Sequence, residues 1–295
     1  MLSIKEKLNT NLCKGKGKLN TNFCKDKGNK GKLTTYLYVY KVQILKSLAY
    51  KFDVYGNIIM QTIIMIATAF FWKALFKNAE SMGGVSVDTM LTYTVISSMI
   101  SVVLITNVEW RITESVQTGA IAIDLMRPVN IFGVFFAENL GSVTALFFQN
   151  LLPIFIIGSL FIKLPAPRSA YEFMLFLISL VLAFFINWYL SVIFGMFSFK
   201  VIEMSALIQV KKHLVRLLSG SMIPLWFFPN WLRGVLEILP FPYIYQLPLS
   251  IYVGHYTSES LVRGIIIQIL WVMALFLIET RLEKQAIKHV MVQGG

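Results

Sequence analysis

Long, almost uncharged apolar runs recur along this chain of 295 residues, and they decide what it can fold into. Several approach or exceed the about 20 residues that a helix needs to cross a hydrocarbon core of about 30 Å. A chain with 56% hydrophobic and 14% charged residues could not bury this surface in one water-soluble core. Because the runs are continuous rather than alternating, we predict an all-α, polytopic membrane protein and not a β-barrel. Its six membrane-spanning helices are expected at 54–76, 89–108, 139–162, 172–199, 204–223 and 260–280.

The run at 204–223 carries more charge than the other five. Four basic residues lie in its middle part: Lys211, Lys212, His213 and Arg216. A charged side chain inside a bilayer is costly. An alternative for this run is therefore a cytosolic helix that enters the membrane only near Leu214.

Positive residues predict the orientation of the spans. With the N-terminus in the cytosol, 6 of the 27 lysines and arginines fall on the outer side, which leaves 21 on the cytosolic side. Without the residues before the first span, the count still favours this orientation by 9 to 6. We expect both termini in the cytosol, below a bacterial-type plasma membrane. The net charge of +12 then reflects contact with anionic membrane lipid, and no nucleic-acid partner is expected.

The chain before the first span is predicted to have two parts. Residues 1–33 are rich in lysine and glycine, which predicts a disordered basic cytosolic tail. This tail could tether the protein to anionic lipid or be a dispensable extension. Residues 34–52 place apolar side chains on one arc with Gln43 roughly opposite, which predicts an interfacial helix rather than a cytosolic extension of the first span. At the other end of the chain, 286–295 is expected to be a cytosolic C-terminal tail.

The segment 223–254 holds five of the nine prolines. Prolines at this density exclude one continuous helix, yet the segment is too apolar and aromatic for an ordinary solvated loop. We predict broken or re-entrant helices at the extracellular interface, with tryptophan and tyrosine side chains at headgroup level. An outer gate over a substrate route and a simple aromatic anchor are equally consistent with this pattern.

A polar connector at 109–138 joins the second and third predicted spans, and the predicted orientation places it in the cytosol. It contains a break at Gly119, a small apolar patch at 120–123 and the run DLMRP at 124–128. Such an alternation of charge, apolar side chains and a proline is typical of a surface that docks onto a soluble partner.

The sequence contains no recognisable catalytic motif. The three histidines are far apart, neither HExxH nor GxSxG occurs, and Cys13 and Cys24 fit no zinc pattern. The glycine-lysine pairs of the tail lack the spaced glycine and the Ser/Thr of a phosphate-binding loop. We therefore predict no catalytic residue, no metal site and no cofactor on this chain. Energy for active transport would come from an ion gradient or from a separate ATPase.

The predicted spans contain few charges, which argues against an ion-coupled carrier, because such carriers bind ions at ionisable groups inside the membrane. The polar residues within the spans are mainly amides, whose ordinary role is hydrogen bonding between helices. One amide cluster, Gln149 and Asn150 shortly before Pro153, is predicted as a candidate transport path.

The layout as a whole resembles the permease subunits of ABC type-2 exporters, in the branch without a fused ATPase. The shared features are an interfacial helix, six spans, a long first cytosolic connector and a proline-broken segment before the last span. The most specific feature is GAIAIDLMRP at 119–128, which is similar to the family's "G…dLlRP" run. The resemblance covers about 34–285, which would form one six-span permease domain, and it leaves 1–33 outside.

The resemblance implies that two permeases pair, as a homodimer or with a related permease, on two cytosolic ATPases that bind the ATP and Mg. A short coupling helix in the first connector would seat in a groove of the ATPase. Its residues here would be Gly119 as the break, Ile121, Ile123, Leu125 and Met126 as apolar contacts, Asp124 and Arg127 as polar contacts or caps, and Pro128 as terminator. The alternative is a juxtamembrane turn in which Arg127 faces lipid phosphate.

The predicted function is the membrane subunit of an ATP-driven exporter that moves a drug, a peptide or a lipid-like cargo, and that is not itself an enzyme. An apolar interior rich in Met and Phe tolerates many shapes, so the sequence selects none of these cargoes. Two alternatives are an ion-coupled secondary carrier and a non-transport scaffold or immunity protein that sequesters a toxic peptide.

Overall fold

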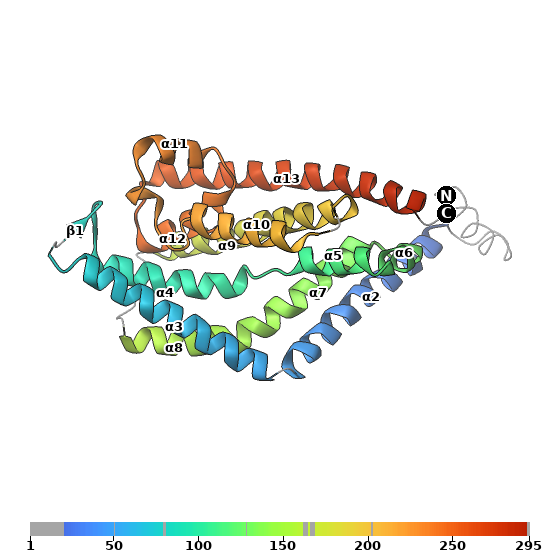
Figure 1. Ribbon diagram of the computed structural model, residues 1–295, viewed down its shortest axis with the longest axis horizontal. Coiled ribbons are helices and arrows are strands. Elements are labelled where there is room, and N and C mark those ends of the chain that lie inside the picture. The colour runs from blue at the N-terminus through green and yellow to red at the C-terminus, as the bar shows by residue number, and fades with distance from the viewer. Residues whose placement is uncertain are drawn as a thin grey trace.

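The described part of the chain is mostly helical (Figure 1). The computed structural model describes residues 21–49, 51–78, 81–127, 129–161, 165, 169–201 and 203–293. The longer helices are α2 (Thr21–Ala49), α3 (Lys51–Leu75), α4 (Val87–Val103), α7 (Ile131–Leu146), α9 (Ala170–Met196), α10 (Ser205–Leu218) and α13 (Ser258–Gln293). The shorter ones are α5 (Val108–Gln117), α6 (Ala120–Met126), α8 (Leu152–Phe161), α11 (Asn230–Glu237) and α12 (Gln246–Val253). Strands β1 (Ser81–Met82) and β2 (Val85–Ser86) form an antiparallel hairpin between α3 and α4.

Five helical stretches of the described residues are long and apolar enough to cross a membrane: Val54–Leu75, Val87–Gln117, Ile131–Ser159, Ala170–Phe199 and Glu259–Ala286. They match the first, second, third, fourth and sixth predicted spans, so the prediction of an all-α polytopic membrane protein is confirmed. The structure differs at 204–223. Here α10 has only 14 residues, which makes it about 21 Å long and too short for a full crossing.

Helix α10 nevertheless restores an even number of passages along the bundle. Five passages alone would leave the two ends of the chain at opposite ends of the molecule. In Figure 1 the first turns of α2 and the last turns of α13 lie at the same end, together with α6. We call this the α6 end, and we call the opposite end, where β1, α11 and α12 lie, the hairpin end.

The second and third spans begin and end elsewhere than predicted. Helix α4 stops at Val103, and residues 104–107 are not helical before α5 begins. Helix α7 begins at Ile131, inside the segment predicted as a connector, because the Asn130 side chain caps it by accepting a hydrogen bond from the Gly133 backbone N–H at 2.9 Å. The predicted connector is therefore mostly helical.

Helix α2 replaces the shorter interfacial helix predicted at 34–52. It begins at Thr21, so the structure assigns helix to 21–33, which was expected to be disordered, while residues 1–20 of that tail lie outside the described residues. The predicted polar face turns out to be a packing face: the Gln43 amide donates to Ser142 of α7 at 2.9 Å. Close approach is permitted by Gly141, where an added Cβ would lie 2.7 Å from the Tyr40 carbonyl oxygen.

The proline-rich segment 223–254 folds as predicted, into several short helices at the hairpin end (Figure 1). These are η3 (Leu225–Phe227), α11, η4 (Phe241–Tyr243) and α12. Buried Tyr93 of α4 donates a hydrogen bond to the Gly220 carbonyl at 2.6 Å, and Gln246 accepts one from the Leu225 backbone N–H at 3.0 Å. The segment is therefore part of the main hydrophobic core and not a loose surface loop.

Candidate functional site

Helix α6 contains five of the eight residues predicted to contact an ATPase, and two more, Gly119 and Arg127, flank it directly. Gly119 separates it from α5 by adopting a left-handed conformation with φ of 72°, which glycine reaches without steric cost. Helix α6 ends at Met126, and Arg127 is extended with φ of −67° and ψ of 147°. An extended residue is expected before a proline. Pro128 itself lies outside the described residues.

The predicted contact residues divide into a buried and an exposed set. Ile121 is only 4% exposed and packs in a hydrophobic cluster with residues of α5, α7 and α9. Leu125 packs partly buried against the same cluster. In contrast, Ile123 is 60% exposed and Met126 is 71% exposed. Ile121 therefore anchors the helix, while Ile123 and Met126 present its outer face.

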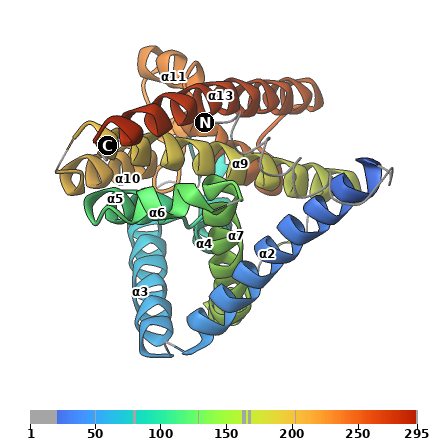
Figure 2. The ribbon, with the colours of Figure 1, turned by 90° about the vertical axis from the view of Figure 1, so that its right-hand side faces the viewer.

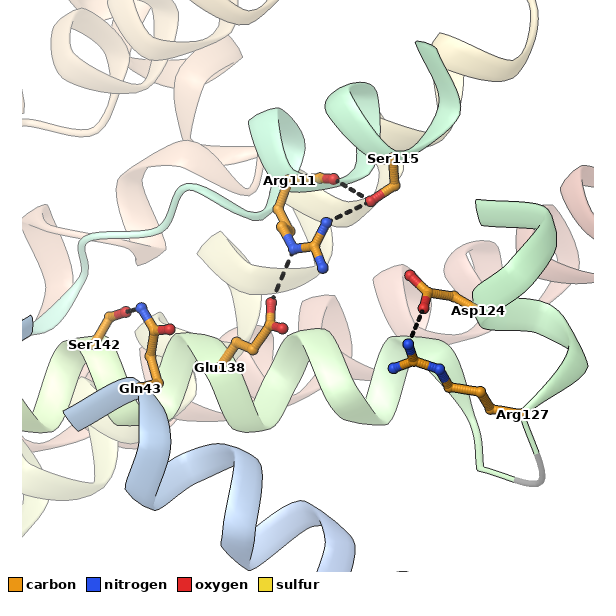
Figure 3. A network of polar contacts seen from close by, with 7 residues as sticks. All are labelled: Gln43, Arg111, Ser115, Asp124, Arg127, Glu138 and Ser142. Carbon is orange, nitrogen blue, oxygen red and sulfur yellow. Dashed lines mark hydrogen bonds and ion pairs between the residues drawn. The ribbon is translucent and has the colours of Figure 1, made fainter. Parts of the chain in front are cut away.

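The two charged residues of this run pair with each other. Arg127 pairs with Asp124 at 3.3 Å, and the arginine side chain remains largely exposed (Figure 3). In Figure 2, which views the molecule from the α6 end, α5 and α6 lie in front of the spans. Helix α6 therefore lies at this end of the bundle, and we call its exposed side chains Ile123, Met126 and Arg127 the outer face of α6.

Helix α5 is fixed to α7 by a polar contact that the sequence analysis did not predict. The Arg111 guanidinium donates to Glu138 at 3.2 Å and to the Ser115 hydroxyl at 2.6 Å (Figure 3). It also lies 5.3 Å from the centre of the Phe135 ring. The signal was visible as two opposite charges at the two ends of the connector, but only the fold brings them together.

A second unpredicted contact fixes α5 to α10. Lys211 forms an ion pair with Glu109 at 3.4 Å and donates to Ser191 of α9. Glu109 is 0% exposed and Lys211 is 4% exposed. Glycine at position 195 of α9 allows α5 to approach, since an added Cβ would lie 3.1 Å from the Glu109 Cα. Helix α5, which directly precedes α6, is therefore in contact with both α9 and α10.

The α6 end is also tied to α2 and α13. The Asn130 amide donates to Glu283 of α13 at 3.1 Å, and its backbone N–H donates to the Tyr36 hydroxyl at 3.2 Å. Three helices that are distant in sequence thus meet at the residue that caps α7. The start of α7 is therefore in contact with both α2 and α13.

Gln149 and Asn150, the candidate transport path, lie away from α6 on a π-helical turn, η1 (Phe147–Leu151). Asn150 is buried, and neither the Gln149 nor the Asn150 carbonyl oxygen has a hydrogen-bond partner among the described residues. A π-turn widens a helix by one residue and is frequent at functional sites. The two residues therefore carry side-chain carbonyl oxygens without hydrogen-bond partners within an apolar span. Their role in transport stays a prediction.

The described residues contain no group of three or more His, Cys, Asp or Glu side chains that could hold a metal ion. The titratable pair with the deepest burial, Glu109 and Lys211, is neutralised internally. The site thus consists of helices joined by polar contacts, with exposed apolar side chains on α6.

Comparison with known proteins agrees with this arrangement. Residues 62–294 match the model of the ABC-2 family transporter protein domain. No curated protein matches the chain significantly. The family match covers all of the described spans except the first turns of α3, and it includes α6 and the Glu109–Lys211 pair. The chain therefore belongs to the ABC-2 transporter family, and it is a multi-pass membrane permease of the ABC transporter type.

Proposed function

We propose that this chain is the permease subunit of an ABC exporter, and that separate cytosolic ATPases drive it by binding the outer face of α6. The observation that carries the proposal is this face itself. A helix of seven residues holds Ile123 and Met126 out at the tip of the bundle, on a chain whose sequence has no phosphate-binding loop. Two large exposed apolar side chains beside a charged one are suited to a groove on a soluble partner.

The contacts behind α6 supply a route for the force. Closure of an ATPase pair around ATP and Mg would displace α6, and α5 would move with it because Ile121 is buried between the two helices and α9. Arg111 would carry the displacement to α7, and Glu109 would carry it to α10. Shifts of packed helices of this kind change the balance between inward-facing and outward-facing states.

The remaining partners follow from the same proposal. Two ATPases require two permease surfaces, so the chain works as a homodimer or with a related permease. The α6 end, where α2 begins and α13 ends, faces the cytosol of a bacterial plasma membrane, as the distribution of lysine and arginine favours. The cargo leaves the cytosol or the inner leaflet between or beside the paired permeases.

The test replaces Ile123 and Met126 together with serine and measures binding to the ABC ATPase that co-purifies with the unmodified chain from its native host, with both proteins co-expressed. We expect at least about a tenfold loss of affinity, because exposed apolar anchors dominate such interfaces. The matched control is Ile238→Ser at the hairpin end, where the side chain is 73% exposed against 71% for Met126. The control variant is expected to bind the ATPase normally.

A second variant changes a partly buried residue of α6 and the exposed charge next to it together. Leu125→Ala combined with Arg127→Glu reverses the exposed charge next to α6 and is expected to reduce both ATPase binding and export. Normal binding and normal export by both the serine and the charge-reversed variants, at normal membrane levels, would refute the proposal. A protein that protects cells without any ATPase would instead act as a scaffold or immunity protein.

A further inference from the structure

A polar cavity is lined by residues of α3, α4 and α10, together with Asn187 of α9. It is half-open and has a volume of about 380 Å³, within the range of about 300–1,000 Å³ that small-molecule sites occupy. The non-helical residues 104–107 form one wall, so the cavity exists because α4 and α5 are not one continuous helix. It lies at the level of the Glu109–Lys211 pair.

The wall contributed by α4 is unusually polar for a membrane span. Thr94, Ser97, Ser98 and Ser101 follow one another at helical spacing and all line the cavity. Their hydroxyls donate to backbone carbonyls, among them Ser97 to the Ser221 carbonyl at 2.8 Å. Their oxygen lone pairs remain to accept hydrogen bonds from water or from a polar guest. This wall can therefore hold a hydrated group within the bundle.

The charges that line the cavity are predominantly positive. Lys211, Lys212 and Arg216 come from successive turns of α10, and Glu109 is the single acidic residue of the lining. Lys211 is already paired with Glu109. Lys212 lies 5.9 Å from the centre of the Trp110 ring, and Arg216 forms no ion pair within the described part of the chain. Two cations thus face the cavity without a carboxylate of their own.

The lining of the cavity also has an apolar part. Ile64 of α3, Val215 of α10 and Met222 belong to it. Neighbouring side chains of both helices are apolar and exposed, Ile63 of α3 and Leu214 of α10 among them. A guest with a charged head in the cavity would therefore place an attached chain against membrane-facing surface.

We propose that this cavity binds the anionic headgroup, a phosphate or a carboxylate, of an amphiphilic cargo whose apolar tail lies along α3 and α10. This inference rests on the proposed transport function and narrows its cargo to one chemical class. Lys212 and Arg216 donate charge-assisted hydrogen bonds to the headgroup, and the hydroxyls of α4 accept from its remaining polar hydrogens or its water. Because Glu109 links the cavity to α5, displacement of α6 reaches the bound headgroup directly.

The test measures binding to the purified full-length chain in dodecyl maltoside micelles, with no ATPase present. Three probes are titrated at constant micelle concentration: dodecyl phosphate, dodecyltrimethylammonium with the same tail and opposite charge, and inorganic phosphate without a tail. We expect saturable binding of dodecyl phosphate, none of the cationic probe, and at least about tenfold weaker binding of inorganic phosphate, because the tail adds buried apolar surface.

Charge variants then assign the site. Arg216→Gln and Lys212→Gln should each weaken dodecyl phosphate binding about tenfold, as expected for one lost hydrogen bond between charged groups. Arg216→Lys should retain most of the affinity. The control is Arg281→Gln, which removes an exposed arginine of α13 outside the cavity and should change nothing.

Each alternative outcome overturns a stated part of the inference. Equal binding of the cationic probe, or equal effects of Arg216→Gln and Arg281→Gln, would exclude an anion site in this cavity. Inorganic phosphate binding as tightly as dodecyl phosphate would identify a free anion and exclude an amphiphile. Because the assay contains no ATPase, its failure leaves α6 docking untouched, and failure of α6 docking leaves the headgroup site untouched.

Discussion

The buried ion pair between α5 and α10 makes a sharp prediction about stability. Glu109→Gln keeps the size of the side chain and removes its charge, which leaves the Lys211 ammonium 4% exposed and without a counter-charge. At the observed separation of 3.4 Å and an effective dielectric constant of about 20, the lost attraction is about 5 kcal/mol. Removal of one partner of a buried pair costs about 3–5 kcal/mol by mutagenesis, so we expect a loss in this range.

The assay is equilibrium unfolding of the purified chain in mixed micelles, followed by far-UV circular dichroism. Two further variants test whether the buried charge of Lys211 causes the loss of stability. Glu138→Gln breaks the partly exposed Arg111–Glu138 pair and should cost no more than about 1 kcal/mol. The double variant Glu109→Gln with Lys211→Met replaces the stranded cation by an apolar side chain of similar length, and it should recover most of the lost stability.

Two results would refute this reasoning. If Glu109→Gln cost no more than Glu138→Gln, the Lys211 ammonium would be hydrated rather than buried. If Lys211→Met failed to rescue Glu109→Gln, the loss would arise from packing of α5 and not from an uncompensated charge. The interaction energy of the double-mutant cycle separates these cases directly.

Three further substitutions, one of them a control, test the packing that fixes the spans. Gly141→Ala should destabilise the chain by about 1–3 kcal/mol, because its Cβ would lie 2.7 Å from the Tyr40 carbonyl oxygen and push α2 from α7. Gly56→Ala in α3, where nothing lies within 4 Å of the added Cβ, should be neutral or stabilising in the same unfolding assay, and equal effects would contradict the close contact. Asn187→Leu removes the amide that donates to the Leu104 carbonyl at 2.6 Å. It should destabilise the chain by about 1–3 kcal/mol and speed amide hydrogen exchange at 104–107. Unchanged exchange would contradict a role of Asn187 in holding the non-helical stretch between α4 and α5.

The candidate coupling helix illustrates how far sequence reasoning reaches. Gly119 and the proline at 128 marked its two ends, because glycine can adopt a left-handed conformation and a proline restricts the residue before it, whatever the tertiary context. Which apolar side chains face outward was not predictable in the same way. Ile121 and Ile123 are equivalent in the sequence, yet the first is buried and the second exposed, since only the packing of α6 on α5 selects the buried face.

The segment at 204–223 could not be assigned from its own sequence. Its hydropathy predicted a span, and its four basic residues pointed to an alternative that the sequence could not resolve. The fold resolves it through long-range neutralisation: Lys211 is buried because Glu109, 102 positions earlier, is brought to it. A signal for the cavity was also present, as hydroxyl residues at helical spacing in α4, but its meaning depends on which helix faces them.

The sequence by itself determined the solvent of this protein and the class of its fold. Apolar runs of span length must lie in a bilayer, and a bilayer forces their backbone into helices because it offers no other hydrogen-bond partners. Prolines and glycines determined where helices break, because they act on the backbone conformation locally. Only the tertiary structure decided which polar groups meet, how α10 completes the bundle and where the outer face of α6 points. Those properties depend on contacts between residues about a hundred positions apart, and local chain preferences carry no information about them.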